Sequence, residues 1–504
     1  MPFAVIEGGI FGAKIVGYGI TRRKPPAHLL DAGLASLGSG VCRSSGSTVR
    51  GILGSVLCGR SRSKVRASFN VLFVKRIGHT LKIHFSSRNI YLWYMPEMYS
   101  KWVACWGNAT SITDRKEATY AKDLTLRYPI RACFSGNKLR FHFSNLTGTE
   151  PVTISEAYVA KAAHSPAAST QFINGAQSTA SETCAAHLDT AQSEYAPVAI
   201  TFGGRTSGTI PAGEEILSDE IAFDVTAGET LDVSLYFAGF TQMNAGTAIT
   251  GPLSGGKYSY GNFAKSAELP DNLTRKTNWI YFLNTVDILT EEKNFALVCF
   301  GDSITAQDWP DYLTLRCARE GFNNVAIIRR AVSGTRILRE YSCITYAAYG
   351  LKGATRFPIE MNVAGARAVI VQHGINDIIH PVGVEVNRFR PWSDMPTADD
   401  LINGVRSLYI MHARKLGLKV YSGTLLPIYG WRTYNENRDI IRMAFNQWLR
   451  TAPEFDGCVD FDKAVRGHEN PKAFSSGFDS GDHLHPSARA YEAMAECVPE
   501  ELLT

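Results

Sequence analysis

The 504-residue sequence lacks any apolar run long enough to cross a bilayer, which takes about 20 residues in a helix. Its ten cysteines show neither C-x-x-C spacing nor the density of a disulfide framework, which suits reduced thiols. The first residues carry Glu7 and no basic stretch before an apolar core, so we expect no signal peptide. Together with 45% hydrophobic and 20% charged residues, these absences predict a globular, cytoplasmic protein.

Basic residues gather in the first fifth of the chain, although the net charge of the whole is only +5. Residues 1–97 hold 14 Lys and Arg against three acidic residues, whereas the remainder holds 38 basic and 44 acidic residues. Only this first part would favour a nucleic-acid or anionic membrane partner. For the protein as a whole we predict no nucleic acid and no membrane among its partners, and the oligomeric state stays open.

Residues 1–97 also differ from the rest in pattern. Gly and Ser recur, an Arg/Ser run occupies 60–63, and short apolar pieces lack the turn residues that would assemble them into a core. We expect a disordered or non-native extension, with a basic RNA-binding arm as the alternative. Met95 and Met98 stand where the composition changes, so we expect natural translation to begin at one of them. The intact mass of protein made from the native gene would test this.

Strand patterns fill residues 98–292. Apolar and polar residues alternate in 139–144, 221–225 and 231–237, and turn residues such as 145–151 separate them. Because no long helical pattern interrupts these strands, the region predicts a jelly-roll-like β-sandwich, which would be an accessory domain.

From residue 293 to residue 504, strand and helix patterns alternate. The strand patterns are 295–301, 324–332, 368–374, 419–427 and a short one near 459–462, and the helical patterns are 308–320, 398–416, 434–450 and 487–497. Alternation of this kind predicts a parallel sheet with helices on both faces, an α/β domain of three layers.

The triplet Gly301-Asp302-Ser303 stands at the end of the first of these strands, shortly before a helical pattern. Open α/β sheets place reactive groups at the carboxyl ends of their strands, so Ser303 is a candidate nucleophile on a tight turn. Ser is also a preferred N-cap residue, and that structural role alone would explain its presence. The choice between the two depends on what the other strand ends carry.

Two further strand ends carry groups that suit the stabilisation of an oxyanion. Gly334 follows the second strand, where a glycine lets the backbone approach closely and aim an N–H at a substrate oxygen. Asn376 follows the third strand, and its side-chain amide is a neutral donor. Taken singly, Gly334 could be only a turn residue and Asn376 only the start of an Asx-turn.

A fourth group lies near the C-terminus, where Asp482 precedes His485 by three residues. A carboxylate at this spacing can accept the ring Nδ1–H and leave Nε2 free to act as a base. Asp479 and His483 lie beside them, which leaves a structural or metal-binding pair as the alternative. Because all these groups follow strands whose carboxyl ends meet at one sheet edge, the combination with Ser303 favours a catalytic site.

These four blocks, at 301–303, 334, 374–377 and 482–485, resemble the signature blocks of the SGNH (GDSL) hydrolases over about residues 295–500. With the strand-rich region in front, the chain is similar to bacterial esterases of this family that carry an N-terminal sandwich. The resemblance implies a flavodoxin-like fold for the catalytic domain. The lack of a G-x-S-x-G elbow fits this, since the family is distinct from the α/β-hydrolases.

The resemblance also implies roles for individual residues. Ser303 would be the nucleophile, His485 the general base and Asp482 the acid that orients it. The oxyanion hole would consist of the backbone N–H groups of Ser303 and Gly334 and the side-chain amide of Asn376. This chemistry requires no metal and no cofactor.

Aromatic residues beside arginines, in the loops after the third and fourth strands, give an indication of the substrate. His380, Trp392 and Trp431 are candidate substrate-binding residues at the rim of the site, with simple loop packing as the alternative. No long hydrophobic loop of the kind that suits a long-chain lipase occurs. We therefore predict a serine esterase that cleaves short-chain esters, in particular acetyl esters, on a small-molecule or oligosaccharide substrate through an acyl-enzyme intermediate.

Two alternatives to this prediction remain open. One is a lipase, thioesterase or acyltransferase of the same fold. The other is a carbohydrate-binding protein with an idle hydrolase domain, and the intact set of catalytic residue types argues against it.

Overall fold

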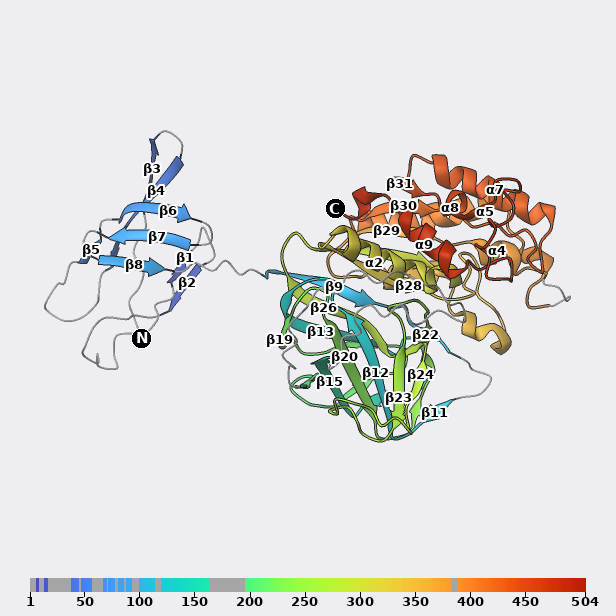
Figure 1. Ribbon diagram of the computed structural model, residues 1–504, viewed down its shortest axis with the longest axis horizontal. Coiled ribbons are helices and arrows are strands. Elements are labelled where there is room, and N and C mark those ends of the chain that lie inside the picture. The colour runs from blue at the N-terminus through green and yellow to red at the C-terminus, as the bar shows by residue number, and fades with distance from the viewer. Residues whose placement is uncertain are drawn as a thin grey trace, which may run out of the picture. The chain divides into compact units, whose positions relative to one another are not determined.

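The computed structural model describes residues 99–113, 119–162, 195–382 and 388–504, apart from the side chains of 344–346, and the backbone of short strands before residue 99. The chain divides into two compact units, Met1–Met98 and Tyr99–Thr504 (Figure 1). In the first unit, strands pair as β1-β2, β3-β4-β5 and β6-β7-β8. We predicted that residues 1–97 are disordered or non-native. Most of these residues lie outside the described part of the chain, so this stays a prediction. The strands are β1 (Ile6–Gly8), β2 (Ala13–Val16), β3 (Gly38–Ser44), β4 (Ser47–Val56), β5 (Ala67–Phe69), β6 (Val71–Ile77), β7 (Thr80–Phe85) and β8 (Arg88–Leu92).

Two antiparallel sheets form the predicted β-sandwich at the start of the second unit (Figure 1). One has the strand order β16-β15-β20-β12-β23-β24, and the other has the order β18-β13-β26-β9 with β19 also paired to β13. The alternating patterns predicted as strands form β19 and lie within β13 and β20. Their inward side chains, such as Phe141, Val233 and Leu235, are completely buried.

The strands of this region are short, and several form small sheets at its margin: β10-β22-β25, β11-β21 and β14-β17. The predicted boundary at 292/293 falls between β26 and the first strand of the α/β domain. The bounds are β9 (Lys101–Gly107), β10 (Ser111–Ile112), β11 (Tyr120–Ala121), β12 (Leu124–Arg131), β13 (Gly136–Ser144), β14 (Val152–Ile154), β15 (Glu156–Lys161), β16 (Val198–Ala199), β17 (Gly208–Ile210), β18 (Glu215–Leu217), β19 (Ile221–Val225), β20 (Thr230–Phe237), β21 (Thr241–Gln242), β22 (Ala245–Ala248), β23 (Gly256–Tyr260), β24 (Arg275–Thr277), β25 (Trp279–Tyr281) and β26 (Leu283–Thr290).

A five-stranded parallel sheet forms the centre of the α/β domain, in the order β28-β27-β29-β30-β31. Every residue of β27 is buried, as its continuous apolar run predicts for a strand covered on both faces. In the register, Gly301 at the end of β27 pairs with Ala331 of β28 and with Gln372 of β29. The carboxyl ends of these three strands are therefore level. The strands are β27 (Phe295–Gly301), β28 (Val325–Ala331), β29 (Ala366–Gln372), β30 (Lys419–Gly423) and β31 (Gly457–Val459).

Helices cover the sheet in two groups, one in which α2 packs against α9 and one in which α5 packs against α7 (Figure 1). The predicted helical patterns correspond to α2, to α5 through α6, to α7 and to α9. The bounds are α1 (Ser303–Ala306), α2 (Trp309–Glu320), η1 (Ile344–Tyr349), α3 (Gly353–Glu360), α4 (Ile375–Ile379), η2 (Trp392–Asp394), α5 (Ala398–Gly404), η3 (Val405–Ile410), α6 (Met411–Lys415), α7 (Glu436–Thr451), α8 (Phe461–Val465), α9 (Ala488–Glu496) and η4 (Glu500–Leu502).

The structure differs from the predicted elements in several places, of which three are informative. The helical pattern at 398–416 is interrupted by the π-helical turn η3 between α5 and α6. Helix α3 was not predicted, because it begins at Gly353 and contains Pro358, both of which disfavour a helix interior. Strand β30 ends at Gly423 rather than at 427, where Pro427 has no N–H to donate to a sheet.

Arg330, near the end of β28, joins the β-sandwich to the α/β domain. Its side chain is 2% exposed. The guanidinium donates to the Asn284 carbonyl at 3.1 Å, to the Thr285 hydroxyl at 2.6 Å and to the Asn108 carbonyl, all on the sandwich side. It also donates to the Glu360 carbonyl at 3.2 Å in the α/β domain. A buried cation satisfied from both sides makes this junction part of the protein interior.

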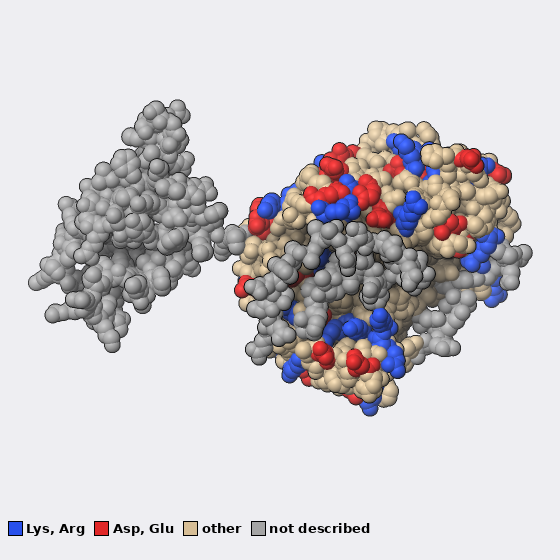
Figure 2. Space-filling model, in the orientation of Figure 1, with Lys and Arg blue, Asp and Glu red and all other residues tan. Residues whose placement is uncertain are grey.

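The described surface of Tyr99–Thr504 carries charges of both signs. Figure 2 shows Lys and Arg side chains interspersed with Asp and Glu side chains on one face. Among the residues that the structure describes, no helix is both long and apolar enough to cross a bilayer.

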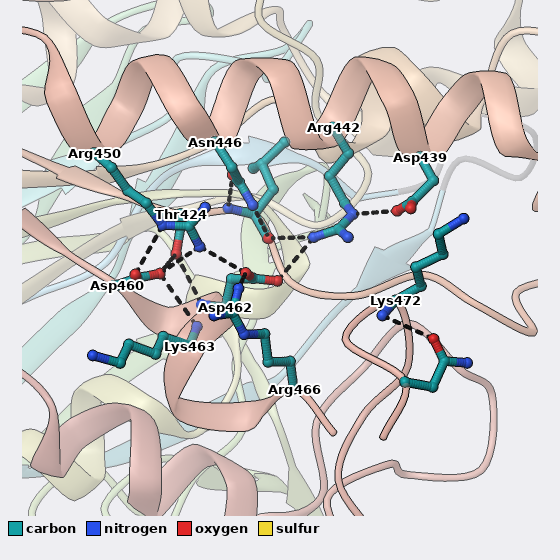
Figure 3. A network of polar contacts seen from close by, with 12 residues as sticks. Thr424, Asp439, Arg442, Asn446, Arg450, Asp460, Asp462, Lys463, Arg466 and Lys472 are labelled. Atoms are coloured by element: carbon teal, nitrogen blue, oxygen red, sulfur yellow. Dashed lines mark hydrogen bonds and ion pairs between the residues drawn. The ribbon is translucent and has the colours of Figure 1, made fainter. Parts of the chain in front are cut away.

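Helix α7 is attached to the end of the sheet by a buried network of ion pairs (Figure 3). Arg442 donates to Asp439 at 2.7 Å and to Asp462 at 2.9 Å, and Arg450 donates to Asp462 at 2.7 Å. Asn446 exchanges two 2.8 Å hydrogen bonds with the backbone of Leu425, just after β30. These contacts fix the segment that follows the fourth strand.

Candidate active site

Ser303 lies at the carboxyl edge of the sheet, as predicted. It is the first residue of α1, which begins immediately after β27, and it is 8% exposed. Asp302 caps this helix, because its Oδ1 accepts the backbone N–H of Ile304 at 3.1 Å. The capping role considered for Ser303 therefore belongs to Asp302, and the Ser303 hydroxyl is available for another contact.

The Ser303 hydroxyl lies against the predicted base. His485 Nε2 is 2.9 Å from Ser303 Oγ, and His485 Nδ1 is 2.6 Å from Asp482 Oδ2. The three side chains thus form a continuous hydrogen-bonded chain in which the imidazole lies between the hydroxyl and the carboxylate. Such a chain can move a proton from the hydroxyl to the ring while the carboxylate stabilises the imidazolium.

The loop that carries Asp482 and His485 holds its own geometry. Asp482 Oδ1 accepts the backbone N–H groups of Leu484 at 2.9 Å and His485 at 2.8 Å. Burial opposes ionisation of this carboxyl, but these bonds and the His485 ring outweigh it and hold the pKa of Asp482 well below its usual range. Asp482 is therefore an anion at any pH at which the enzyme would work.

Asp479 and His483 form a separate pair on the same loop. His483 Nδ1 contacts Asp479 Oδ2, while Asp479 Oδ1 accepts the backbone N–H of His483 at 3.0 Å and that of Gly481 at 2.8 Å. These contacts shape the turn before the base. Within the described ranges, no three His, Cys, Asp or Glu side chains converge as metal ligands would.

Gly334 occupies the loop after β28 in a conformation that requires glycine. Its φ is +79°, and a Cβ there would overlap the ring of Tyr349. The aromatic ring therefore packs directly on the backbone of this loop. Because the ends of β27 and β28 are level, the loop stands next to Ser303 at the sheet edge.

Asn376 lies on α4, which follows the end of β29, and is 2% exposed. Its Nδ2 donates to the Thr335 carbonyl at 3.1 Å, so one of the two amide hydrogens is engaged by the Gly334 loop. The neighbouring Asp377 accepts the N–H groups of Ile337 at 2.7 Å and Leu338 at 3.1 Å. The loop after β28 and the helix after β29 are thus bonded to each other at two points.

Two buried carboxyls flank the site on this side. Burial raises the pKa of Asp302 to about 7, although the Ile304 N–H and the nearby His485 act in the opposite direction. Burial likewise raises the pKa of Asp377 to about 6, partly offset by the N–H groups that it accepts.

The three candidate substrate-binding residues lie in different environments. His380 is 7% exposed, contacts the Tyr341 hydroxyl and stacks on Tyr349 at 5.3 Å between ring centroids. Trp392 is 63% exposed, whereas Trp431 is only 9% exposed and offers little ring surface to a ligand. Their role in substrate binding stays a prediction.

Sequence reasoning gave no role to several buried residues of this site. His373, directly before Gly374, contacts the Thr335 carbonyl and the hydroxyl of Tyr409. Asp302 and Asp377 were noted only as parts of their motifs. The one available signal was position, because His373 and Asp377 lie at or just beyond the carboxyl end of a strand.

Several solved structures of hydrolases are similar to part of this chain. An acetylxylan esterase from Geobacillus stearothermophilus is 17% identical, with 42% of this chain and 96% of that chain covered, at a TM-score of 0.29. A GDSL-like lipase from Bacteroides thetaiotaomicron is 18% identical, with 41% and 87% covered, at a TM-score of 0.30. No curated protein matches the chain.

A family model matches the α/β domain itself. Residues 297–498 match the GDSL-like lipase/acylhydrolase family, and this range includes the Ser303, Asp482 and His485 chain. The α/β domain therefore belongs to the SGNH (GDSL) hydrolases. This domain is a serine esterase domain of that family.

Proposed function

We propose that this esterase removes short acyl groups, above all acetyl groups, from carbohydrate through an acyl-enzyme intermediate on Ser303. The observation that carries the catalytic part of the proposal is the hydrogen-bonded chain of Ser303, His485 and Asp482, at 2.9 Å and 2.6 Å. Nucleophile and base lie within the distance over which a proton moves directly.

In this mechanism His485 removes the Ser303 proton as Oγ attacks the ester carbonyl. Asp482, ionised and bonded to Nδ1, stabilises the imidazolium that forms. The imidazolium then returns the proton to the departing alcohol. Water repeats the cycle on the acyl-enzyme and releases the acid.

The tetrahedral oxyanion would be held by three donors. The Ser303 N–H lies in the first turn of α1, where N–H groups have no partner within the helix. Gly334 would add a second N–H from the neighbouring loop. Asn376 would add the amide hydrogen that the Thr335 carbonyl does not accept. Donors fixed in this way stabilise developing charge without reorganising during the reaction.

The preference for a short acyl group rests on the aromatic side chains around the Gly334 loop. Tyr349 packs on Gly334, and Tyr341 and His380 contact Tyr349 and each other. We infer that this cluster limits the space for a long acyl chain beside the loop. The preference for carbohydrate rests on the exposed ring of Trp392 and on Tyr429, which is 48% exposed, since sugar rings stack on such surfaces.

The partners and the compartment are part of the same proposal. The expected partner is a small-molecule or oligosaccharide ester, and the mixed charges of the surface in Figure 2 suit a neutral one. The cysteines of the described ranges all carry free thiols, which supports a reducing compartment such as the cytoplasm.

Labelling with a fluorophosphonate probe tests the nucleophile. We expect the wild type to be labelled at Ser303 and to release acetate from acetylated oligosaccharides. We expect Ser303→Ala to lose both properties while its circular dichroism spectrum stays unchanged. Turnover by the Ala variant above a few per cent of wild type would contradict the assignment.

A series of p-nitrophenyl esters tests the acyl preference. We expect kcat/KM to be highest for the acetate and to fall through butyrate to octanoate and palmitate. A rate that rises toward octanoate or beyond would instead indicate a lipase or a thioesterase.

A further inference from the structure

We propose that His373 is a positioning residue for the oxyanion hole, which it serves through the Thr335 carbonyl that also orients the Asn376 amide. The inference rests on the proposed function, since it assigns a task to a residue behind the oxyanion donors. His373 itself touches neither Ser303 nor His485 in any of the described contacts.

The Thr335 carbonyl is the centre of the arrangement. It accepts two hydrogen bonds, from Asn376 Nδ2 at 3.1 Å and from His373 Nε2 at 3.1 Å. A primary amide is planar and carries two hydrogens on its nitrogen. Once one hydrogen is bonded to a fixed carbonyl, the direction of the second hydrogen is set as well. The position of the Thr335 oxygen therefore decides where Asn376 aims its free N–H.

The hydrogen bonds also fix the tautomer of His373. A backbone carbonyl only accepts, so Nε2 must carry the hydrogen that it donates to Thr335. In a neutral ring Nδ1 then accepts, and the Tyr409 hydroxyl lies 2.8 Å from it. Burial, together with the nearby Arg356, lowers the pKa of His373 to about 3, so the ring stays neutral in the working pH range.

Packing leaves the imidazole no alternative position. His373 is 2% exposed, its ring lies nearly parallel to that of Tyr409, and the edge contact with Phe300 has a centroid distance of 5.5 Å. Gly353 at the start of α3 provides the space, because a Cβ there would overlap the Tyr409 hydroxyl. The ring is therefore held from several sides.

The Thr335 side chain is held as well. Its hydroxyl donates to the Leu351 carbonyl at 3.2 Å and accepts from Arg356 at 3.3 Å. Residue 335 follows Gly334, so the same contacts position the loop that would supply the second oxyanion donor. His373 thus acts on two donors of the proposed hole through one carbonyl.

Two substitutions of His373 separate positioning from packing. His373→Gln places an amide nitrogen near the position of Nε2 and keeps a donor to Thr335, whereas His373→Asn is too short to do so. We expect the Asn variant to lose about tenfold or more in kcat with KM within about twofold, and the Gln variant to keep at least about a third of wild-type kcat. Equal losses in the two variants, or a loss confined to KM, would overturn the proposal.

Tyr409→Phe provides a variant that keeps the ring packing and removes only the hydroxyl. We expect a smaller decrease in kcat, about threefold, because Nδ1 loses its donor while Nε2 still reaches Thr335. His142→Gln, on β13 of the sandwich, is the matched control and should leave kcat unchanged. A Tyr409→Phe variant with wild-type kcat would contradict the positioning role of His373, even if the His373 variants failed to fold.

Nitrogen-15 spectra of histidine-labelled wild-type protein provide a readout that does not depend on activity. We expect the His373 signal to show a neutral ring protonated at Nε2, without titration between about pH 5 and pH 9. Protonation at Nδ1, or a titration near neutral pH, would overturn the proposal. If the wild type releases no acetate and is not labelled at Ser303, the proposed function fails instead, whatever the spectra show.

Discussion

The loop that carries Asp482 and His485 and the sheet edge that carries Asn376 form the two sides of the site, and they are built differently. On the loop, the Asp482 side chain is 42% exposed, and its hydrogen bonds reach no further than three residues along the chain. At the sheet edge, Asp302, His373, Asn376 and Asp377 are at most 3% exposed. Their partners are Ile304 in α1, residues 335, 337 and 338 in the loop after β28, and Tyr409 in η3, up to 41 residues away in sequence.

Because of this difference, substitutions on the two sides should affect different properties of the protein. The loop is a local motif whose polar groups remain in contact with water, so a change there alters the chemistry and leaves the rest of the fold in place. The sheet edge is a buried network, so removal of one member leaves donors or acceptors without partners inside the protein. Variants on the two sides should therefore separate catalysis from stability.

The largest expected effect is on the exposed side. Asp482→Ala removes the carboxylate that orients the base, and we expect kcat to fall about 10³–10⁴-fold. The free energy of unfolding should change by less than about 1 kcal/mol, because water can replace the bonds to the loop backbone. Steady-state kinetics and urea unfolding of the same sample measure the two quantities. A loss of several kcal/mol would show that the loop is not locally independent.

Asn376→Ala should have the next largest effect on rate. Removal of one oxyanion donor lowers kcat about 10²–10³-fold, with little change in KM, since the donor acts on the transition state. The Thr335 carbonyl keeps the His373 donor, which limits the loss of stability. A rise in KM with unchanged kcat would place Asn376 in ground-state binding instead.

Asp377→Ala should affect both properties. The N–H groups of Ile337 and Leu338 would lose their buried acceptor, which should cost about 2–4 kcal/mol of unfolding free energy. We expect kcat to fall about tenfold as the Gly334 loop loosens. Asp399→Ala, at an exposed position in the first turn of α5, is the control and should change stability by less than about 0.5 kcal/mol. Equal stability losses in the two variants would remove the contrast between buried and exposed carboxyls.

The smallest expected effect is a pH dependence of stability with opposite signs on the two sides. The pKa of Asp302 is raised from 3.8 to about 7, so the folded protein holds a proton that the unfolded chain has released. Stability should therefore decrease as the pH rises from about 4 to about 7. The pKa of Asp482 is lowered, so its contribution is present above the unfolded value and is lost on acidification.

Asp302→Asn tests this dependence, because Asn keeps a cap acceptor but cannot ionise. We expect the Tm of the variant, relative to wild type, to increase between pH 5 and pH 7 and to level off above about pH 7. Thermal unfolding followed by circular dichroism measures it. A difference that stays constant over this range would mean that Asp302 does not titrate there.

The sequence predicted the α/β domain closely because each strand is a short apolar run followed at its end by a small polar block. β27 has the predicted bounds, and the Asp482–His485 contact follows from a three-residue spacing. The buried side was harder to predict. The direction of the Thr335 carbonyl and the meeting of His373 with Tyr409, 36 residues away, depend on tertiary packing that no local pattern encodes. The aromatic residues show the same limit, since Trp392 is exposed and Trp431 is buried although both occur in loops beside arginines.

Arg330 has a consequence for how such a protein can be rebuilt. Its guanidinium depends on the carbonyls of Asn108 and Asn284, which come from two segments far apart in the sandwich. Replacement of the sandwich by that of another protein would leave this buried cation without acceptors, unless the new sandwich supplied oxygens at the positions of the Asn108 and Asn284 carbonyls. The β-sandwich and the α/β domain must therefore be exchanged together, both in engineering and in evolution.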